Sequence, residues 1–490
     1  MNEARTVVLL AAGVGKRMHS TLPKMLHPLL GRTLVGHVLH AAEALHADRT
    51  LVVVGTGAEQ VAAHVTEVSS GAQIVLQSQQ RGTGHAARTA LEAAPDVTGT
   101  VVVLYGDTPL LRSQTLESLI EKHAATGAAA TVLTAVVDDP FGLGRIARDA
   151  AGAVTKIVEQ RDASPDETAI REINSGIYAF RADLLREMLG KLSSDNAQGE
   201  EMLTDVIGLL INAGHRVEVE AAVDANEALG CNDRAQLSDL RTLMRDRVNG
   251  DLMRSGVTMI DPATTWIDVT VTVGIDALIE PGTQLRGTTA IGPGATVGPD
   301  TTLVDVTVGS GASVIRTHGS SSVVGPGASV GPFAYLRPGT DLAATGKIGT
   351  FVETKNAKIG RGSKVPHLSY VGDATIGENA NIGAATIFVN YDGVNKHHTT
   401  VGDAAFVGCD SALIAPVTIG AGAYVGAGSV IVQDVPSGAL AVSRVPQRNV
   451  AGWVAKKRPG TKSAAAAGDA SGDGAGGAPG DAAGDEPNMS

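Results

Sequence analysis

From about Trp266 to Val442, small aliphatic residues recur at every sixth position. The longest run is Val401, Val407, Leu413, Ile419, Val425 and Ile431, and shorter runs at 291–303, 324–336 and 376–388 keep the same spacing. A period of six fits neither an amphipathic helix nor an alternating strand. It is typical of a parallel β-helix, whose coils stack one inward position into a continuous column. The pattern therefore predicts a β-helix here, with accidental spacing in a Gly/Val-rich β-sandwich as the alternative.

Residues 1 to about 230 alternate short aliphatic runs with helical patterns. Five valine-rich runs predict strands at Thr6–Leu10, Thr50–Val54, Ala72–Leu76, Thr100–Leu104 and Ala129–Val136. Four segments between them have helical periodicity, at 33–46, 59–68, 84–94 and 113–126. This alternation predicts an α/β domain with a mostly parallel sheet that is covered on both faces. Ligands in such domains bind beyond the carboxyl ends of the strands.

Three further segments complete the predicted organisation. Apolar residues at helical intervals predict a linker helix over 233–254, and a break in the six-residue grid at 389–400 predicts a projecting polar loop. From Pro459 the composition falls to Ala, Gly, Asp, Ser and Pro, which buries too little apolar surface to offset its ordering entropy. We therefore expect an α/β domain at 1–232, the linker helix, a β-helix at 255–458 and a disordered tail at 459–490.

Composition and charge narrow the class of protein. The 490 residues exceed one ordinary domain, and the combination of 43% hydrophobic with only 3% aromatic residues suits a narrow coil packed by small aliphatic side chains. A net charge of −12 argues against binding of nucleic acid or of an anionic membrane. Cys231 and Cys409 lie far apart without metal-ligand spacing, and no apolar run is long enough for a membrane span. These features predict a soluble protein of the reducing cytoplasm.

A pair of glycines follows the first predicted strand, within the segment LAAGVGKRM at residues 10–18. Backbone N–H groups in such a turn approach anions, and Arg17 and Lys24 add positive charge. The segment is no Walker P-loop, because Leu10 and Arg17 occupy positions where that motif has Gly and Ser or Thr. It is no dinucleotide fingerprint either, since Met18 replaces the third glycine. The glycine pair alone leaves phosphate binding and a plain tight turn open.

A carboxylate stands at the end of another predicted strand. The strand at 100–104 runs into Tyr105-Gly106-Asp107, so Asp107 lies at the carboxyl edge of the sheet. An oxygen ligand at this place suits a Mg²⁺ ion that bridges phosphates, with a helix-capping aspartate as the alternative. Residues Gln77, 80–85, Glu159 and Asn174 are expected to crowd the same edge.

The opening LAAGxGxRM, followed by LPK at 22–24, resembles the sugar-phosphate nucleotidylyltransferases. Together with the six-residue repeats, residues 5–458 resemble the GlmU family, which joins an N-acetylglucosamine-1-phosphate uridylyltransferase to a glucosamine-1-phosphate N-acetyltransferase. The resemblance implies a Rossmann-like α/β nucleotidylyltransferase domain followed by a left-handed parallel β-helix. It also implies synthesis of UDP-N-acetylglucosamine from glucosamine-1-phosphate, acetyl-CoA and UTP, with Mg²⁺ as cofactor. A homotrimer with acetyl-transfer sites between subunits is implied as well.

The resemblance assigns roles in the first site residue by residue. The expected nucleotide contacts are Leu10, Ala11, Ala12, Gly13, Gln77 and Gly82, and the cations that face the phosphates are Arg17 and Lys24. The expected sugar contacts are Thr83, Gly144, Glu159 and Asn174, while Tyr105 and Gly106 line the site. The expected Mg²⁺ ligands are Asp107 and Asn232. In this chemistry the sugar phosphate attacks the α-phosphorus of UTP in line, so the protein must neutralise and align two anions. Lys16 departs from the Thr or Ser usual in the family and should alter the charge of the loop more than its path.

Polar residues cluster in the β-helix half, where an aliphatic coil does not need them: Arg337, Lys355, His367, Tyr370, Asn381, Asn390 and Tyr391. A structural histidine is the plain interpretation of any one His, but VPHLSYVGD around His367 matches the acetyltransferase motif of the family. The resemblance makes His367 the base that accepts a proton from the attacking amine. It places Arg337, Lys355, Tyr370 and Asn381 on glucosamine-1-phosphate and the following residues on acetyl-CoA: Ala384, Asn390, Tyr391, Cys409, Ala427 and Arg444.

Several questions stay open at this level. Cys409 replaces the usual Ser and donates a weaker hydrogen bond, so the affinity for acetyl-CoA is expected to differ. The basic residues 456–458 fit either CoA phosphates or a solvated charge run. The bifunctional enzyme has two alternatives. One is a nucleotidylyltransferase whose β-helix only oligomerises, as in relatives of ADP-glucose pyrophosphorylase, and the other is a non-catalytic scaffold subunit. The cluster around His367 argues against the first, and the joint presence of Lys24, Asp107 and Asn232 argues against the second.

Overall fold

A computed structural model provides the fold and describes residues 4–55, 58–196 and 198–469. The chain divides into two compact units. The first unit holds the described residues up to Val271 together with Gln284–Gly287, and the second holds Thr272–Thr283 and the described residues from Thr288 onward.

A mixed sheet forms the centre of the first unit. Its order is β11-β7-β10-β6-β1-β4-β5. The strands are β1 (Arg5–Ala11), β4 (Arg49–Val54), β5 (Ala72–Leu76), β6 (Thr100–Tyr105), β7 (Ala130–Val136), β10 (Glu172–Arg181) and β11 (Val217–Ala221). Strand β1 runs parallel to β4 and β6, whereas β10 is antiparallel to β6 and β7. Strands β8 (Arg145–Arg148) and β9 (Val154–Val158) extend the sheet beyond β10. The predicted mostly parallel sheet is confirmed, and β10 is an antiparallel strand that the valine-rich runs did not reveal.

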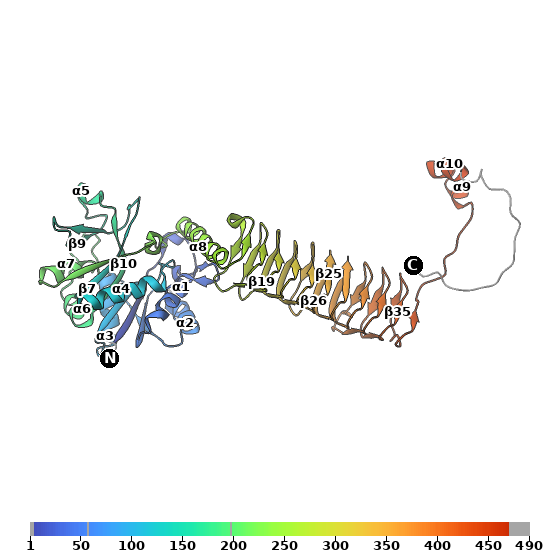
Figure 1. The fold of residues 1–490 in the computed structure, drawn as a ribbon, viewed down its shortest axis with the longest axis horizontal. Coiled ribbons are helices and arrows are strands. Elements are labelled where there is room, and N and C mark those ends of the chain that lie inside the picture. Colours follow the sequence, from blue (N-terminus) through green and yellow to red (C-terminus); the bar gives the residue numbers. More distant parts are fainter. Residues whose placement is uncertain (1–3, 56–57, 197, 470–490) are drawn as a thin grey trace. The chain divides into compact units, whose positions relative to one another are not determined.

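Helices cover both faces of this sheet (Figure 1). They are α1 (Leu34–Ala42), α2 (Ala58–Val68), α3 (Thr83–Ala93), α4 (Ser113–Thr126), α5 (Pro165–Thr168), α6 (Ala182–Leu189) and α7 (Asp205–Asn212). Alternate residues of β1 enter two different cores: Val8 and Leu10 pack with α3, α6 and α7, while Val7 and Leu9 pack with α1, α2 and α4. This alternation is what a strand buried on both faces requires. The predicted helix at 33–46 ends earlier, at Ala42, and continues as the 3-10 turn η3 (Glu43–Leu45).

Besides helix α8 (Arg234–Arg254), the first unit contains several short elements. They are η1 (Lys16–Met18), η2 (Lys24–Leu26), β2 (Pro28–Leu29), β3 (Arg32–Thr33), η4 (Ala225–Ala228), β12 (Thr258–Met259), η5 (Pro262–Thr264), β13 (Trp266–Ile267) and β16 (Gln284–Arg286). The Asp233 side chain caps α8 by accepting hydrogen bonds from the backbone of Ala235 and Gln236. Leu237, Leu240 and Met244 pack in one core cluster with residues of the N-terminal half. The helix predicted at 233–254 thus exists and completes the core of the first unit.

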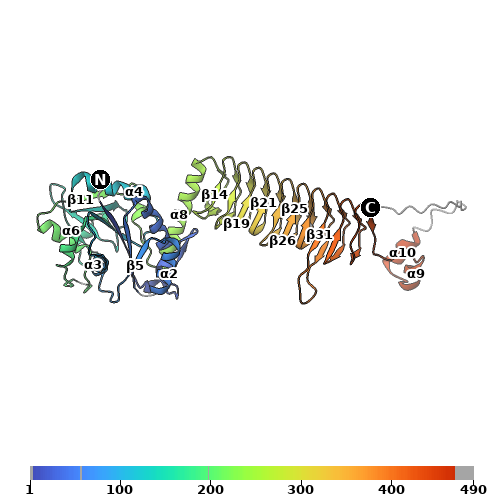
Figure 2. The same ribbon diagram turned by 90° about the horizontal axis from the view of Figure 1, so that it is seen from below.

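The second unit is a stack of parallel coils (Figures 1 and 2). Its strands are β14 (Thr272–Val273), β15 (Leu278–Ile279), β17 (Ala290–Ile291), β18 (Thr296–Val297), β19 (Thr302–Val308), β20 (Ser313–Val314), β21 (His318–Val324), β22 (Ser329–Val330), β23 (Tyr335–Leu336), β24 (Asp341–Leu342), β25 (Lys347–Thr350), β26 (Glu353–Ile359), β27 (Lys364–His367), β28 (Tyr370–Ile376), β29 (Asn381–Ile382), β30 (Ile387–Val389), β31 (Thr399–Val401), β32 (Phe406–Val407), β33 (Ala412–Ile414), β34 (Val417–Ile419), β35 (Tyr424–Val425), β36 (Val430–Ile431) and β37 (Leu440–Ala441). Each strand pairs with the equivalent strand of the next coil, as in β26–β28, where Lys355 lies opposite Gly372. The predicted β-helix is confirmed.

The six-residue grid marks the inward positions of these coils. Every residue of the run from Val401 to Ile431 is buried, with at most 5% of its surface exposed. The predicted polar loop is present between β30 and β31 and leaves the stack (Figure 2). An isolated antiparallel bridge joins Tyr391 to Lys396 inside this loop.

The end of the chain departs from expectation. Helices α9 (Trp453–Lys457) and α10 (Lys462–Asp469) follow the last coil, so disorder from Pro459 is wrong for residues 462–469. Four consecutive alanines in α10 explain the difference, because alanine has the highest helix propensity. Residues 470–490 of the predicted tail lie outside the described residues. None of the helices in the described part of the chain has the length and apolar character that a membrane span needs.

Candidate active sites

A cavity of about 470 Å³ lies at the carboxyl ends of β1 and β6 in the first unit. It combines the turn after β1, the segment after β5, the first turn of α3 and the end of β6. The predicted site residues that line it are Leu10, Ala12, Gly13, Lys24, Gln77, Gly82, Thr83, Tyr105 and Asp107. The structure therefore brings together in one cavity predicted residues that are up to 97 positions apart in sequence.

Lys24 and Asp107 form an ion pair in this cavity. Lys24 Nζ lies 2.5 Å from Asp107 Oδ2, and the two side chains are 9% and 17% exposed. Gly15 has a φ of 62°, and a Cβ on it would lie only 2.6 Å from Lys24 Cβ. A glycine is needed here because a side chain would push the lysine away. The second glycine of the opening motif therefore positions Lys24.

The predicted sugar contacts Gly144, Glu159 and Asn174 form an adjoining group. A Cβ on Gly144 would lie 3.5 Å from Asn174 Cβ and 3.7 Å from Glu159 Oε1. Burial raises the pKa of Glu159, although Thr204 donates a hydrogen bond to its Oε1 at 3.2 Å. Burial also raises the pKa of Tyr105, whose phenol is close to Thr83 and Glu159. Tyr105 thus connects this group to the cavity.

Four other predicted residues lie outside both the cavity lining and the group of Gly144, Glu159 and Asn174. Arg17 is exposed in η1, and its neighbour Lys16 lines the cavity instead. Ala11 points into the core on the opposite face of the sheet. Gly106 donates its backbone N–H to Leu10 O at 3.0 Å, which fixes the end of β6 against β1. Asn232 follows Cys231, whose backbone N–H donates to Asp107 O at 3.0 Å.

Gln80 and Glu200 are two polar lining residues to which the sequence assigned no role. Gln80 donates a hydrogen bond from Nε2 to Ala12 O at 3.0 Å and so holds the loop after β1. Glu200 lies beside Glu201, which pairs with Arg88 at 2.6 Å. Gln80 belongs to the polar run expected at this edge. Glu200 lies in an irregular segment without periodicity, so no pattern marks it.

The Mg²⁺ ion expected at Asp107 would need oxygen ligands from substrate phosphates and water as well as from the protein. Among the residues that the structure describes, no group of three or more His, Cys, Asp and Glu is arranged to hold a metal ion. Mg²⁺ is commonly held by one or two carboxylates together with substrate phosphates and water. Asp107, a single carboxylate that lines a cavity of about 470 Å³, fits that kind of ligation.

In the second unit, the outer surface of β26 and β28 carries a polar network. Asp373 Oδ2 accepts a hydrogen bond from Asn390 Nδ2 at 2.5 Å and lies 3.9 Å from Lys355 Nζ. Asn390 Nδ2 also lies 3.3 Å from the Tyr370 hydroxyl. Three predicted residues, Lys355, Tyr370 and Asn390, therefore meet around Asp373, which the sequence did not single out.

Lys396 joins the same network from the polar loop. Its ammonium lies beside that of Lys355, which lowers the pKa of Lys396, while Asp373 and Tyr370 oppose this effect. Two adjacent ammonium groups form a place for an anion. The loop therefore supplies a cation that the interrupted grid alone did not identify.

Four of the six residues expected to contact acetyl-CoA lie in a column across successive coils, whereas Asn390 and Tyr391 do not. Backbone hydrogen bonds connect the coils at this corner: Ala385 to His367 O, Asp410 to Ala384 O, and Gly428 to Cys409 O, at 3.1, 2.7 and 2.8 Å. Arg444 Nη1 donates to Ala427 O at 2.7 Å. His367 and Cys409 are exposed at this corner. The structure thus aligns His367 with Ala384, Cys409, Ala427 and Arg444.

The other predicted residues of the second unit lie apart from these groups. Arg337 Nη1 pairs with Glu353 at 2.9 Å, one coil before Lys355. Tyr391 donates its hydroxyl to Gly393 O at 2.6 Å and remains 55% exposed. Asn381 lies in β29, which pairs with β27. The polar network therefore lies on the sheet that contains β26 and β28, and the column lies on the sheet that contains β27 and β29.

Comparisons with known proteins agree with this division. The family model "MobA-like NTP transferase domain" matches residues 7–198, and "Bacterial transferase hexapeptide (six repeats)" matches residues 398–433. The chain is 58% identical to Bifunctional protein GlmU of Streptomyces avermitilis, over 94% of this chain and 96% of the relative. It is 56% identical to Bifunctional protein GlmU of Corynebacterium efficiens, over 96% of this chain and 97% of the relative. For the protein of the same name from Kineococcus radiotolerans, the identity is 58% over 94% of both chains.

A sheet-edge cavity in an NTP-transferase domain and a polar network on a hexapeptide β-helix are features of a two-domain transferase. Both domain types occur in the order predicted from the sequence. The chain belongs to the family of bifunctional GlmU proteins. This membership confirms the prediction of an enzyme with two transferase activities, one of a nucleotidyl group and one of an acyl group.

Proposed function

We propose that this protein makes UDP-N-acetylglucosamine in two steps. The β-helix transfers the acetyl group of acetyl-CoA to glucosamine-1-phosphate, and the α/β domain then transfers uridylyl from UTP to N-acetylglucosamine-1-phosphate. Pyrophosphate and free CoA are the other products. The proposal extends to the site residues, the magnesium ion, a homotrimer and a location in the cytoplasm.

In uridylyl transfer, the cavity at the ends of β1 and β6 holds the nucleotide. The phosphate oxygen of the sugar attacks the α-phosphorus in line, and the bond to pyrophosphate breaks, so no protein nucleophile is needed. Lys24 lies where it faces the phosphates, and Lys16 and Arg17 extend the positive charge. Asp107 and Asn232 would hold Mg²⁺, which supplies charge neutralisation between the phosphate groups. Gly144, Glu159 and Asn174 would hold the sugar.

In acetyl transfer, the amine of glucosamine-1-phosphate attacks the thioester carbon. An ammonium has no lone pair for attack, so His367 accepts its proton, and the C–S bond breaks as the amide forms. The ammonium groups of Lys355 and Lys396 provide the place for the sugar phosphate, with Arg337 one coil away. Tyr370 and Asn381 would hold the sugar, and Asn390 and Tyr391 would orient the amine and the developing oxyanion. The column Ala384, Cys409, Ala427 and Arg444 would carry acetyl-CoA.

An exposed apolar ladder supports a trimer. Phe333 and Phe351 stack with ring centroids 5.3 Å apart and are 53% and 57% exposed, and Leu368 follows on the next coil with 58% exposed. Such a patch is typical of a protein–protein interface. Assembly would also bring the polar network of one chain to the column of another, which lie on different sheets within a chain.

One observation carries the proposal against its rivals. A β-helix that only oligomerises has no need for the buried and half-buried polar groups around Asp373 on an otherwise aliphatic coil. Such groups carry a desolvation cost, which a binding role justifies. The same network is of no use to a scaffold without catalysis.

The test is an assay with each reactant omitted in turn. Pure protein is incubated with glucosamine-1-phosphate, acetyl-CoA, UTP and Mg²⁺, while free thiol and pyrophosphate are followed separately. We expect thiol release without UTP, and pyrophosphate release only when acetylated sugar phosphate is present. Asp107→Asn should remove pyrophosphate release alone. His367→Ala should remove thiol release, and its pyrophosphate release should return when N-acetylglucosamine-1-phosphate is supplied. Pyrophosphate release without any thiol release would favour a nucleotidylyltransferase with a structural β-helix, and neither product would favour a scaffold.

A further inference from the structure

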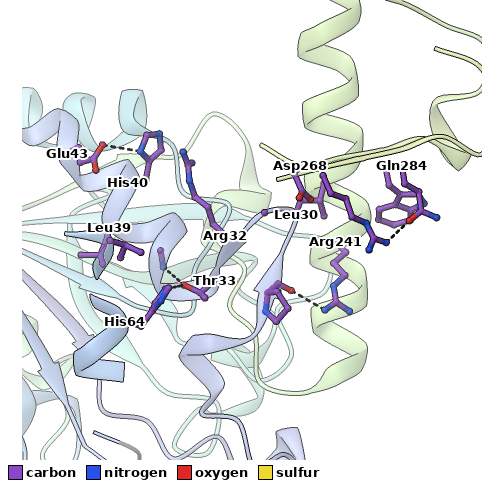
Figure 3. A pocket seen from close by; sticks show the side chains of 16 residues that line it. Leu30, Arg32, Thr33, Leu39, His40, Glu43, His64, Arg241, Asp268 and Gln284 are labelled. Carbon is purple, nitrogen blue, oxygen red and sulfur yellow. Dashed lines mark hydrogen bonds and ion pairs between the residues drawn. The ribbon is translucent and has the colours of Figure 1, made fainter. Parts of the chain in front are cut away.

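A second cavity in the first unit, of about 900 Å³, belongs to neither proposed site (Figure 3). Its walls are the β2–β3 hairpin, the first turns of α1, one side of α8, and the strands β13 and β16. All of these elements lie inside the first unit. The volume falls in the range of pockets that enclose small organic ligands.

Three arginines line this cavity. Arg241 donates from Nη2 to Pro28 O at 3.0 Å, and Arg286 donates from Nη2 to Gln284 Oε1 at 2.5 Å. Arg32 is half-buried, and among the described residues no hydrogen bond or ion pair engages its guanidinium group. Burial lowers the pKa of Arg32, and the charge of Glu43 only partly opposes this. A half-buried cation without a partner at a cavity wall indicates a missing anion.

The carboxylates at the same walls are already engaged. Glu43 Oε2 pairs with His40 Nδ1 at 3.0 Å, and Asp268 Oδ2 accepts a hydrogen bond from the backbone of Gly287 at 2.9 Å. Figure 3 shows the Glu43–His40 pair beside Arg32, with the dashed contact directed to His40. The cavity therefore retains positive charge that its own acidic side chains do not neutralise.

Helix α1 adds to this polarity. Its N-cap Thr33 accepts a hydrogen bond from Gly36 N at 3.0 Å, and His64 Nε2 lies 2.8 Å from the same hydroxyl. Thr33 and Gly36 both line the cavity, so the positive end of the helix dipole faces it. A Cβ on Gly36 would lie 2.9 Å from Thr33 Oγ1, which explains why the first turn stays open.

The remaining wall suits an organic group. Leu39, Val68 and Trp266 line it, and Arg245 lies 5.0 Å from the centre of the Trp266 ring, which fixes the indole. An inorganic ion alone would leave most of a 900 Å³ cavity and this apolar wall unused.

We propose that the cavity binds a phosphorylated small molecule, with its phosphate at Arg32 and the first turn of α1 and its organic part against Trp266. Planar guanidinium groups match the oxygens of a phosphate, and Arg241 and Arg286 stand at the same cavity to contact a second anionic group. The catalytic cavity is lined by a different set of residues, so the two sites are separable by mutation.

The test is isothermal titration of the full chain with three probes: inorganic phosphate, adenosine monophosphate and glucose 6-phosphate. Proteins to compare are wild type, Arg32→Gln, Arg241→Gln, and Arg216→Gln as a matched control, since Arg216 pairs with Glu218 on the surface of the same unit. Each probe is also titrated into Lys24→Gln, in which the catalytic cavity has lost its buried cation. Melting curves establish that each variant is folded, and Arg32→Lys replaces Arg32→Gln if that protein is unstable.

We expect at least one of the two organic probes to bind Lys24→Gln as it binds wild type. Its affinity should fall about ten- to a hundred-fold in Arg32→Gln and Arg241→Gln, the range for a lost charged hydrogen bond, and stay unchanged in Arg216→Gln. Preference for adenosine monophosphate would identify a nucleotide, and preference for glucose 6-phosphate a sugar phosphate. The proposal is overturned if binding is equal in wild type and Arg32→Gln, if inorganic phosphate alone binds, or if no probe binds at millimolar concentration.

Discussion

Replacing Lys24 with Gln tests whether the buried ion pair with Asp107 organises uridylyl transfer. The substitution keeps a polar, slightly shorter side chain but removes the charge that lies 2.5 Å from Asp107 Oδ2. Removing one preorganised group that stabilises transition-state charge costs about 2.7–4 kcal/mol, or about 10²–10³ in kcat. We therefore expect pyrophosphate release to fall by about that factor, while acetyl transfer in the same protein stays at the wild-type rate.

The structure also sets the effect on stability. With exposures of 9% and 17%, the pair lies between a surface ion pair and a fully buried one. Its loss should lower the free energy of unfolding by about 1–3 kcal/mol, because Asp107 keeps a charge without its partner. Asp107→Asn in the Lys24→Gln background removes that charge, so the double variant should regain part of the lost stability without regaining activity.

Matched variants make the test specific. Arg17 is exposed outside the cavity and Lys16 lines it, so Arg17→Gln should cost less than Lys24→Gln, and acetyl transfer serves as the internal control for folding. The assay follows pyrophosphate release with UTP and N-acetylglucosamine-1-phosphate in excess. The reasoning is refuted if Lys24→Gln keeps its rate within about threefold of wild type, a loss far below the cost of one such group. It is equally refuted if Arg17→Gln loses more activity than Lys24→Gln.

Four other substitutions or truncations follow from particular contacts. Burial lowers the pKa of His37 from 6.5 to about 4, so the unfolded chain binds the proton first as pH falls. The free energy of opening measured by hydrogen exchange of the α1 amides should therefore fall by up to about 3 kcal/mol between pH 6.5 and pH 4. In His37→Gln this free energy should depend less on pH. The same pH dependence in His37→Gln and wild type would contradict the prediction. Asp373→Asn weakens the contacts to Asn390 and Lys355, so KM for glucosamine-1-phosphate should rise about tenfold while uridylyl transfer is unaffected; an unchanged KM argues against this positioning role. Cys409→Ser restores a stronger donor at the exposed corner and should lower KM for acetyl-CoA, whereas a higher KM would show that the thiol is preferred. Truncation after Pro459 should leave both rates within about twofold, and loss of thiol release would assign a role to α10, whose side chains have few contacts to lose.

The spacing of apolar residues along the chain was enough to predict the architecture. In a β-helix every coil repeats the same inward position, so the spacing from Val401 to Ile431 identifies the buried column without knowledge of any distant contact. The strands of the α/β domain are similarly marked by valine-rich runs, and the ends of β1 and β6 placed Lys24 and Asp107 at one edge. Antiparallel β10 was missed, because strand direction depends on connection and pairing rather than on composition.

Tertiary structure decided which side chains meet. Asp373 ends the motif VPHLSYVGD but received no role, and Lys396 has no sequence signal. Pairing of β26 with β28 brings Asp373 to Lys355, and the loop at 390–398 brings Lys396 there. Lys16, and not Arg17, lines the cavity proposed for uridylyl transfer, because the 3-10 turn after Gly15 sets which way each side chain points. Arg32, Arg241 and Arg286 are separated by up to 254 positions and share a cavity only because α8 and β16 pack beside the β2–β3 hairpin. A repeat or a strand end is written in neighbouring residues, whereas a site made of distant segments exists only once their elements have packed together.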